Sequence, residues 1–464
     1  MSIPYWVEDA IFYQIFPDRF ANGDPAHLTA STLPWDAPPT IHGFQGGDLR
    51  GIVQKLDYLL DLGINAIYLN PIFQATSTHR YNTTDYFKID NKLGDIRDFE
   101  ALIQSAHTNG IRVVLDGVFN HCGRGFFAFN DLLENQEQSP YKDWFHVKRF
   151  PVRAYNPGET EDYLAWWGFK SLPKFNFSSP AVRKYFLDVA RYWIDQGCDG
   201  WRLDVPNEID DDQFWADFRQ VVKTANPDAF ILGEIWDGNP NWVGETKFDG
   251  LMNYPIRDAV LNWLTGKGSV SQFAQHVEKQ MTLYARENVY AMYLLLGSHD
   301  TERIWTVLGG NIAKVKLAFQ FLFALPGAPA IYYGDEIGME GGKDPACRHT
   351  FMWEERTWQK ELRAWLQKLV ALRKTRVVLR RGEFQRVNVD DIRGCYAFMR
   401  SLGESHVLAV FNASNTRRHL RLPVGGLGWS DGLIVHNIME PGDFIVSGDT
   451  LAVSLSPWSG MLIA

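Results

Sequence analysis

The stretch IRVVLDGVFNH, Ile111 to His121, opens with apolar and β-branched residues and closes on Asp116, Asn120 and His121. An apolar run of this length predicts a buried strand, and the polar side chains at its end are available for chemistry. The same pattern recurs along the chain and gives eight strand candidates, at residues 10–16, 64–70, 111–118, 199–205, 229–236, 248–254, 290–298 and 328–336.

Helical stretches separate these strands. Apolar residues spaced by three and four predict helices at 49–63, 98–110, 181–197 and 314–327, and several of these end at a glycine. Strands that alternate with helices predict βα units around a parallel sheet. Eight strands favour a closed TIM (β/α)8 barrel over an open doubly wound sheet.

Two segments depart from this alternation. About 60 residues separate the third strand from the helix near Pro180, whereas an ordinary βα loop has roughly two to six. After the last barrel helix, at 358–376, the chain changes to short strands with Gly-rich turns. We therefore expect an α/β protein with three parts: a barrel at 1–121 and 178–381, a small inserted subdomain at 122–177, and a C-terminal all-β sandwich at 382–464.

Composition narrows the class of partner. The 464 residues are 45% hydrophobic and 22% charged, which is typical of a globular protein. The net charge is −9 and no basic stripe is present, which disfavours a nucleic acid partner. The N-terminus has no signal-peptide pattern and no run of about 18 apolar residues occurs, so we expect a cytoplasmic protein with no membrane partner. The four cysteines lack metal-ligand spacing and are expected to be free thiols.

Ionisable residues follow several of the strand candidates. They are Asp116 and His121 at the third, Arg202, Asp204 and Glu208 at the fourth, Glu234 at the fifth, His299 and Asp300 at the seventh, and Asp335 and Glu336 at the eighth. In a TIM barrel these strand ends meet in one mouth. Any one of them could be a helix N-cap, but several carboxylates in one water-poor mouth repel each other, which argues against a purely structural role.

Two carboxyl groups with different pKa values suit the hydrolysis of an acetal. One must be protonated to donate to the leaving oxygen, and the other must be ionised to attack the sugar carbon. Asp204 and Glu234 are the expected pair. Arg202 lies on the same side of the strand as Asp204 and is expected to hold it ionised. Glu234 has no neighbouring cation in sequence, so apolar surroundings are expected to raise its pKa.

Seven short motifs all resemble motifs of the same protein family. They are GDLRGI (47–52), DGVFNH (116–121), LPKFN (172–176), GWRLDVPNE (200–208), GEIW (233–236), LLGSHD (295–300) and GAPAIYYGDE (327–336). This set resembles the α-amylase superfamily, glycoside hydrolase family 13, and in particular its cyclomaltodextrinase, neopullulanase and maltogenic amylase branch. The resemblance implies a retaining mechanism with Asp204 as nucleophile, Glu234 as acid/base and Asp300 as the third catalytic carboxylate.

The resemblance also implies which residues bind substrate. His121 and His299 would donate hydrogen bonds to the reacting glucose, Tyr81 of the segment HRY (79–81) would stack on it, and Asp344 and Arg348 would bind the next sugar. The remaining residues implied to bind substrate are His79, Asp116, Arg202 and Glu208. For Glu208 a salt bridge at the rim of the site is an alternative interpretation.

Two departures from the family pattern affect partners and cofactors. Members of this branch commonly carry a β-rich N-terminal domain that closes a dimer, but here the first strand begins about ten residues in. We therefore expect that domain to be absent, the cleft to be more open and the protein to be a monomer. No organic cofactor is expected.

The second departure concerns calcium. FANGDPAHL (20–28) resembles a calcium loop of this branch, and Asn22, Asp24, Gly46 and Asp48 match its ligands. His27 and Leu28 stand where a second ligand pair should be. Calcium takes six or more oxygen ligands, so we expect this site to be weak or empty.

The expected activity is hydrolysis of α-1,4 bonds, with α-1,6 bonds as further candidates, in maltooligosaccharides, cyclodextrins, pullulan or branched α-glucans. One alternative is a transglycosylase of the same family. Another is a catalytically silent glucan-binding protein, which the presence of Asp204, Glu234 and Asp300 disfavours. A phosphate-binding barrel enzyme is also disfavoured, because the loop after the eighth strand, GDEIGMEGG (334–342), is acidic.

Overall fold

Eight short parallel strands form the central sheet of the protein, for which the computed structural model describes residues 2–464. A parallel bridge between Met252 and Tyr293 joins the two outer strands and closes the sheet into a barrel, as predicted. Its strands, in spatial order, are β8 (Gly250–Leu251), β7 (Phe230–Gly233), β6 (Gly200–Leu203), β5 (Arg112–Gly117), β2 (Ala66–Leu69), β1 (Phe12–Ile15), β10 (Ala328–Tyr332) and β9 (Tyr293–Leu294).

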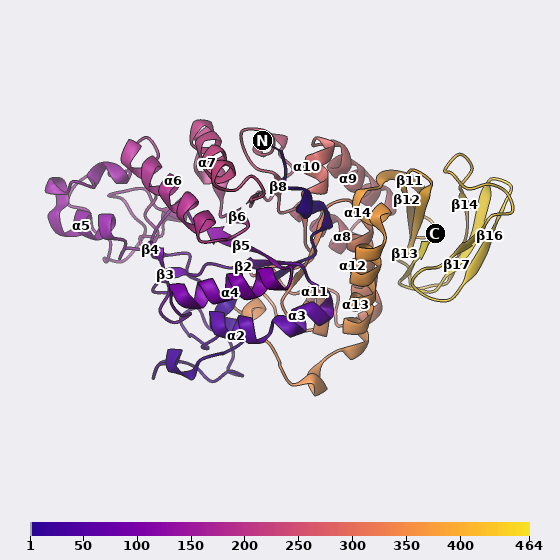
Figure 1. The fold of residues 1–464 in the computed structure, drawn as a ribbon, viewed down its shortest axis with the longest axis horizontal. Coiled ribbons are helices and arrows are strands. Elements are labelled where there is room, and N and C mark those ends of the chain that lie inside the picture. Colours follow the sequence, from indigo (N-terminus) through magenta and orange to yellow (C-terminus); the bar gives the residue numbers. More distant parts are fainter. Residues whose placement is uncertain (1) are drawn as a thin grey trace.

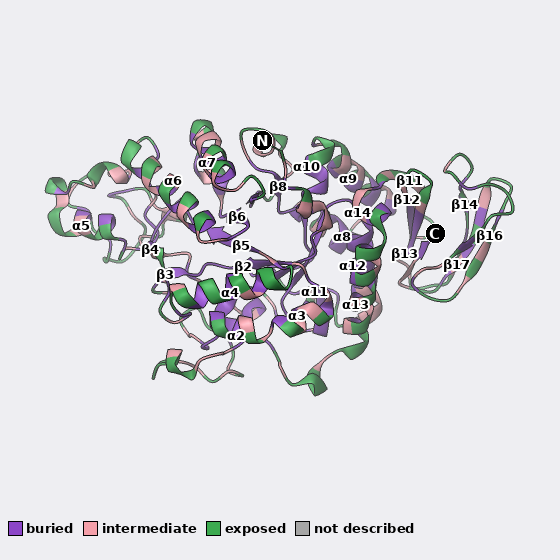
Figure 2. Cartoon of the chain, viewed as in Figure 1, coloured by how far each residue is buried: buried purple, intermediate pink, exposed green. Residues whose placement is uncertain are grey.

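Helices surround the barrel, and most of them have one buried and one exposed face (Figure 2), whereas α1 and α12 expose no face. They are α1 (Pro17–Phe20), α2 (Leu49–Gln54), α3 (Leu56–Leu62), α4 (Ile96–Thr108), α6 (Pro180–Asp195), α7 (Asp212–Ala225), α8 (Tyr254–Leu264), α9 (Val270–Thr282), α10 (Arg286–Tyr290), α11 (Ile304–Val307), α12 (Ile312–Ala324), α13 (Lys360–Thr375) and α14 (Val377–Arg381).

The single helix expected at 49–63 was wrong. The chain leaves helical geometry at Lys55, so that α2 and α3 are separate helices. The break lets the two apolar faces pack on different neighbours, α2 on α4 and α3 on α13. Helix α3 ends as predicted at Gly63, whose φ of +88° is the left-handed conformation that glycine adopts readily.

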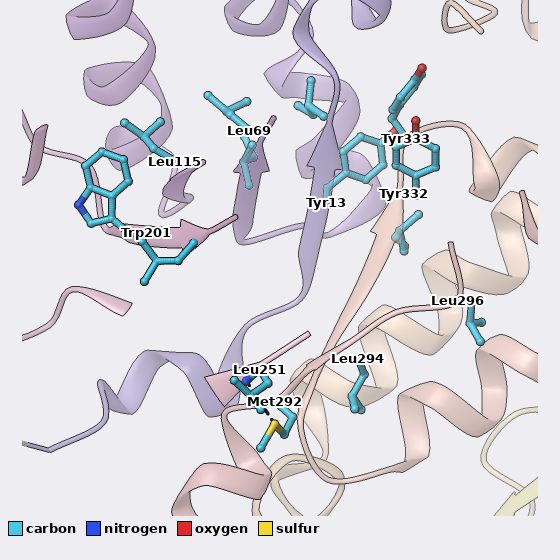
Figure 3. Close-up of a cluster of buried hydrophobic side chains, with 14 of the residues drawn as sticks. Tyr13, Leu69, Leu115, Trp201, Leu251, Met292, Leu294, Leu296, Tyr332 and Tyr333 are labelled. Carbon is cyan, nitrogen blue, oxygen red and sulfur yellow. Dashed lines mark hydrogen bonds between the residues drawn. The ribbon is translucent and has the colours of Figure 1, made fainter. Parts of the chain in front are cut away.

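Successive residues of each strand face opposite sides of the barrel wall. One buried cluster, which includes Phe12, Tyr68, Val114 and Phe230, fills the barrel interior. The larger cluster lies between strands and helices, and Figure 3 shows part of it, including Leu69, Leu115 and Trp201. Because the two clusters alternate along each strand, the polar residue two positions after an interior residue also faces the barrel axis.

The long segment after β5 folds beside the mouth of the barrel, as the sequence predicts for an inserted subdomain. It contains α5 (Phe127–Asn135) and three 3-10 turns, η3 (Gln136–Gln138), η4 (Lys142–Trp144) and η5 (Trp166–Gly168). A hairpin of β3 (Phe73–Ala75) and β4 (Thr83–Ile89), which the sequence analysis missed, follows β2. An antiparallel bridge from His121 to Lys174 ties the segment to the end of β5, and a bridge from Ala165 to Pro173 lies within the segment.

Two antiparallel four-stranded sheets follow α14 and form the all-β sandwich (Figure 1). In spatial order the first sheet has β11 (Glu383–Asp390), β12 (Cys395–Leu402), β13 (Ser405–Asn412) and β18 (Ser459–Ile463). The second has β14 (Arg418–Pro423), β17 (Thr450–Leu455), β16 (Asp443–Ser447) and β15 (Ile434–His436). The first sheet also packs on α12. The domain boundaries given above stay predictions.

All four cysteines, Cys122, Cys198, Cys347 and Cys395, are buried and unpaired. Within residues 2–464, none of the helices combines the length and the apolar character needed to cross a membrane.

Candidate active site

Arg202 lies at the centre of the barrel mouth and contacts three carboxyl groups. Its Nη1 lies 2.8 Å from Asp116 Oδ1 and 3.0 Å from Asp204 Oδ1, and its Nη2 lies 2.8 Å from Glu234 Oε1. The side chains come from β5, β6 and β7, at positions that face the barrel axis. Glu234 has no cation next to it in sequence, but adjacent strands in register bring Arg202 to it across the sheet.

The backbone around these residues is fixed by the ladder of the sheet. Asp204 N–H donates to Gly117 O and Glu234 N–H donates to Leu203 O, each at 3.0 Å. The strand pairing thus continues to the two central carboxyl residues, whose side chains are almost fully buried. Such rigid elements hold reacting groups more accurately than loops do.

Burial raises the pKa of the carboxyl groups in the mouth, although the positive charge of Arg202 opposes it. The pKa of Glu234 rises to about 7. The pKa of Asp204 also rises well above its ordinary value, with repulsion from Glu234, Asp116 and Asp300 adding to burial. The expectation that Arg202 keeps Asp204 ionised is therefore incomplete, because one guanidinium offsets only part of this cluster. Burial and mutual repulsion thus favour the protonated form of both carboxyl groups, and the charge of Arg202 opposes this.

Two further donors reach Glu234. The Val205 N–H donates to Glu234 Oε2 at 3.0 Å, and the indole N–H of Trp236 donates to Oε1 at 3.3 Å. Trp236 stacks face to face on Tyr254, with ring centroids 3.7 Å apart, and is about half exposed. Its exposed indole therefore forms part of the wall beside Glu234.

His299 is held as a neutral hydrogen-bond donor. Gln14 Nε2 donates to its Nδ1 at 3.0 Å, which leaves the proton on Nε2. That Nε2 contacts the hydroxyl of Tyr81 and lies 3.1 Å from Asp300 Oδ2. Burial lowers the pKa of His299 well below its ordinary value. Tyr81 also donates to Asp116 Oδ2 at 3.0 Å and stacks on the His299 ring, so the expected substrate-binding residues form one network.

His121 has a buried nitrogen that makes no hydrogen bond to the residues that the structure describes. Its Nδ1 accepts from Asn120 Nδ2 at 3.1 Å, so Nε2 carries the proton, and among residues 2–464 this buried Nε2 has no partner. Burial lowers the pKa of both His121 and His79 to about 3, so both are neutral donors. Trp166 from η5 stacks on His121 at 5.3 Å. His121 is therefore free to donate to a ligand.

Arg348 joins the remaining predicted residues to the site. Its Nη2 lies 3.2 Å from Asp300 Oδ1, its Nη1 lies 3.1 Å from Asp344, and its Nε donates to the His299 carbonyl at 2.8 Å. Asp300 is thus placed between Arg348 and His299. Burial also raises its pKa, and Arg348 opposes that rise.

Glu208 lies at the rim, on the turn that follows β6. Lys174 Nζ lies 2.7 Å from Glu208 Oε2 and also donates to the Glu208 carbonyl at 3.1 Å. This is the salt bridge that the sequence analysis gave as the alternative to substrate contact. Both side chains stay partly exposed.

Asp335 and Glu336 end β10 but are bound elsewhere. Asp335 pairs with Arg303 at 2.9 Å, and Glu336 Oε1 accepts from Tyr13 at 2.8 Å and from Tyr58 at 2.6 Å. Tyr13 belongs to the outer cluster between the barrel wall and the helices, so Glu336 faces away from the barrel axis. Both carboxyl groups therefore stabilise the packing around β10.

The loop that resembles a calcium site is already filled by donors. Asp48 caps α2, and its oxygens accept the backbone N–H groups of Gly23, Asp24 and Gly51. His27 Nδ1 lies 3.0 Å from Asp48 Oδ2. No oxygen of Asp48 is left without a donor.

A guanidinium group supplies positive charge in the same loop. Arg50 forms ion pairs with Asp24 and Asp98, while the Asn22 amide donates to the Gly46 carbonyl. In the part of the chain that the structure describes, no group of three or more His, Cys, Asp or Glu side chains is arranged to hold a metal. The oxygens of Asp24 and Asp48 and the Gly46 carbonyl already accept hydrogen bonds within the protein, and a weak or empty calcium site stays a prediction.

Four contributors to the site were missed by the sequence analysis. Gln14, Tyr68 and Asn70 lie at the ends of β1 and β2, and Tyr68 donates to Asp116 Oδ2 at 2.6 Å. They could have been found by counting two residues along each strand from the interior apolar positions. Lys174 comes from the inserted segment, and only its tertiary bridge to His121 brings it to the site.

Residues 14–380 match the model of the alpha amylase catalytic domain. The chain belongs to the alpha-amylase family. It is 45% identical to a cyclomaltodextrinase of Geobacillus thermopakistaniensis, over 99% of this chain and 78% of that protein. It is 39% identical to an intracellular maltogenic amylase of Bacillus subtilis, over 96% of this chain and 77% of that one.

A solved structure of similar fold covers the whole chain. The cyclic α-maltosyl-(1→6)-maltose hydrolase of Arthrobacter globiformis is 38% identical, with a TM-score of 0.91 and 100% of each chain covered. The resemblance drawn from the seven motifs, including the branch with cyclomaltodextrinases and maltogenic amylases, is thereby confirmed.

Proposed function

We propose that the protein is a retaining α-glucan hydrolase in which Asp204 is the nucleophile and Glu234 is the general acid/base. The observation that carries this proposal is the set of buried carboxyl groups around Arg202 in the mouth of an alpha-amylase-family barrel. The raised pKa of Glu234, about 7, suits a group that must donate a proton near neutral pH.

The reaction takes two steps. Protonated Glu234 donates its proton to the glycosidic oxygen while Asp204 attacks the anomeric carbon, so the leaving sugar departs neutral and a glucosyl ester forms on Asp204. Glu234, now ionised, then takes a proton from water, which attacks the same carbon and releases Asp204. Arg202 contacts both carboxylates and stabilises whichever is ionised at each step.

Neutral donors in the mouth suit an uncharged sugar. The Nε2–H groups of His121 and His299 would hold hydroxyl groups of the reacting glucose, with Asp300 and Arg348 beside them. The exposed indole of Trp236 offers a flat apolar surface that suits a pyranose ring, whereas the ring of Trp166 stacks on both His121 and Trp167. These features support a glucan ligand over a charged one.

The bonds cleaved are α-1,4 linkages, with α-1,6 linkages as further substrates. A cyclomaltodextrinase and a hydrolase of a cyclic α-maltosyl-(1→6)-maltose among the similar proteins support this pair. A transglycosylase would use the same residues and differ only in whether water or a sugar attacks the glucosyl ester. A silent glucan-binding protein is disfavoured because the full carboxyl set is in place.

Product chromatography tests the proposal. The wild type and Asp204→Asn are each incubated with β-cyclodextrin, pullulan and a branched maltooligosaccharide. We expect shorter linear maltooligosaccharides or panose from the wild type only. Products longer than the substrate would favour the transglycosylase, and no turnover of any substrate by the wild type would refute the enzyme and favour the glucan-binding protein.

The state of the protein in solution is part of the proposal. We expect a monomer located in the cytoplasm, and the similarity to an intracellular maltogenic amylase supports that location. Light scattering on the purified full chain would give its mass directly, and a dimer would contradict the first expectation.

A further inference from the structure

Val205, directly after Asp204, has a backbone conformation that is unfavourable for valine. Its φ is +35° and its ψ is 52°, in the left-handed region. A β-branched residue there is a true outlier, because its side chain crowds the backbone. The next residue is Pro206, which pushes the residue before it toward extended geometry. Surrounding contacts must therefore impose this conformation.

The unusual conformation directs one hydrogen bond at the acid/base. The Val205 N–H donates to Glu234 Oε2 at 3.0 Å. Rotation about φ sets how this peptide is oriented relative to the turn that follows it. If Val205 relaxed to a negative φ while the strand before it and the turn after it stayed in place, the peptide that joins Asp204 to Val205 would have to rotate and would turn its N–H away from Glu234. Strained backbone at a reacting group is a reason to ask what holds it.

The turn that follows Val205 is held at its far end. Turn η6 (Pro206–Glu208) closes with the Glu208 N–H donating to the Val205 carbonyl at 2.9 Å. Lys174 binds Glu208 twice, at the side-chain Oε2 at 2.7 Å and at the carbonyl at 3.1 Å. One ammonium group therefore fixes both the side chain and the backbone of the residue that ends the turn.

Lys174 itself is attached to the barrel. It forms an antiparallel bridge with His121, and its backbone N–H donates to the Leu164 carbonyl at 3.0 Å. The following Phe175 N–H donates to the Asn120 carbonyl at 3.0 Å. Lys174 thus connects the end of β5 to the turn after β6. Its own backbone is held to the barrel by these hydrogen bonds.

We propose that Lys174 is a positioning residue that acts through Glu208 to hold Val205 in its left-handed conformation and so keeps its N–H on Glu234. This inference rests on the proposed role of Glu234 as acid/base. Lys174 touches no reacting atom in this account. It would act on the geometry and proton affinity of Glu234 through the backbone.

The groups that face Glu234 define what the loss of this contact would do. They are Arg202, whose charge lowers the pKa of Glu234, and Asp300, Asp116 and Asp204, whose charges raise it. The Val205 N–H also lowers that pKa, because it stabilises the ionised carboxylate. Removing this donor leaves Glu234 with a higher pKa than in the wild type and with a less fixed side chain.

The test is the pH profile of kcat/KM for maltotriose in Lys174→Met. We expect the alkaline limb to move up by about one pH unit, which is about a tenfold change in proton affinity. We also expect kcat on the acid side of the limb to fall by roughly tenfold, because the proton donor is misaligned. Lys174→Arg keeps a cation that can reach Glu208 and should restore most of both properties.

A double variant separates positioning from a general loss of stability. Glycine adopts positive φ without strain, so the left-handed conformation at residue 205 should depend less on the contact between Lys174 and Glu208 in Val205→Gly. We expect Lys174→Met/Val205→Gly to have its alkaline limb closer to that of the wild type than Lys174→Met alone. A matched control is Lys170→Met, since Lys170 donates to Asn156 and Pro157 within the inserted segment and does not reach the barrel. Its limb should stay in place.

Two results would overturn the inference. One is a Lys174→Met profile with the wild-type limb and kcat. The other is a shifted limb that Val205→Gly does not bring back. Failure of the proposed function looks different, because the wild type itself would then show no turnover of maltotriose, or Glu234→Gln would keep the alkaline limb.

Discussion

Replacing the acid/base, Glu234→Gln, tests the assignment of roles to the two central carboxyl groups. The change keeps the shape of the side chain and removes the titrating proton. Because an amide has a single acceptor oxygen, Glu234→Gln keeps only one of the two hydrogen bonds from Val205 and Trp236. General acid catalysis contributes roughly 10²–10⁴-fold, equivalent to about 3–5 kcal/mol of barrier. We expect kcat/KM for maltotriose to fall by that amount.

The size of the pH effect follows from the burial of Glu234. Its pKa rises from 4.5 to about 7, which corresponds to roughly 3 kcal/mol of preference for the protonated form. Near pH 7 about half of the molecules then hold the proton, and each further pH unit lowers that fraction about tenfold. The wild type should therefore lose activity above about pH 7, and Glu234→Gln should lack this limb.

A substrate that needs no acid separates acid catalysis from other effects. Fluoride leaves without being protonated, so α-maltosyl fluoride should form the glucosyl ester in Glu234→Gln with far less loss than maltotriose. Asp204→Asn should fail on both. Asp335→Asn is the matched control, because the pKa of Asp335 is also raised to about 7 but its partner is Arg303, away from the mouth. An equal loss of Glu234→Gln on both substrates would refute the reasoning.

Three further outcomes are expected. Chelator or added calcium should leave the melting temperature unchanged in calorimetry, and a fall with chelator would contradict this. Arg50→Leu should lower the melting temperature, because Asp24 and Asp98 lose their cation. Arg202→Leu should lower the free energy of unfolding by roughly 3–5 kcal/mol in urea titrations, since buried carboxylates lose their counter-charge. Because the raised carboxyl pKa values mean that protonated forms are favoured in the fold, that loss should be smaller at pH 5 than at pH 8.

Much of the fold follows from local pattern. Each of the eight predicted strands is present, because an apolar run bounded by helical periodicity has few other ways to bury its side chains. The observed strands are shorter than the predicted runs, since strand pairing ends where the chain turns toward the helices. The break at Lys55 was missed because helical periodicity continues across it, and only packing on α4 and α13 separates α2 from α3.

The residues of the candidate site were also visible in the sequence, because a barrel brings all its strand ends to one mouth. Asp204 and Glu234 directly follow β6 and β7, and Asp300 lies on the loop after β9. The structure brings most of the predicted substrate-binding residues into contact around them, while Glu208 stays at the rim. The sequence did not predict how the charges of these residues affect one another's pKa. Arg202 reaches Glu234 from the neighbouring strand, and burial raises the pKa of Asp204 despite that same arginine.

What the sequence by itself determined is therefore the barrel and the residue types in its mouth, because both depend on periodicities of two and 3.6 residues within short segments. Only the tertiary structure decided which charged groups lie in contact with each other. Lys174 meets Glu208 across 34 residues, and His27 and Arg50 form ion pairs with Asp48 and Asp24. Such contacts depend on strand register and on the paths of the loops. A local pattern of residues encodes neither of these.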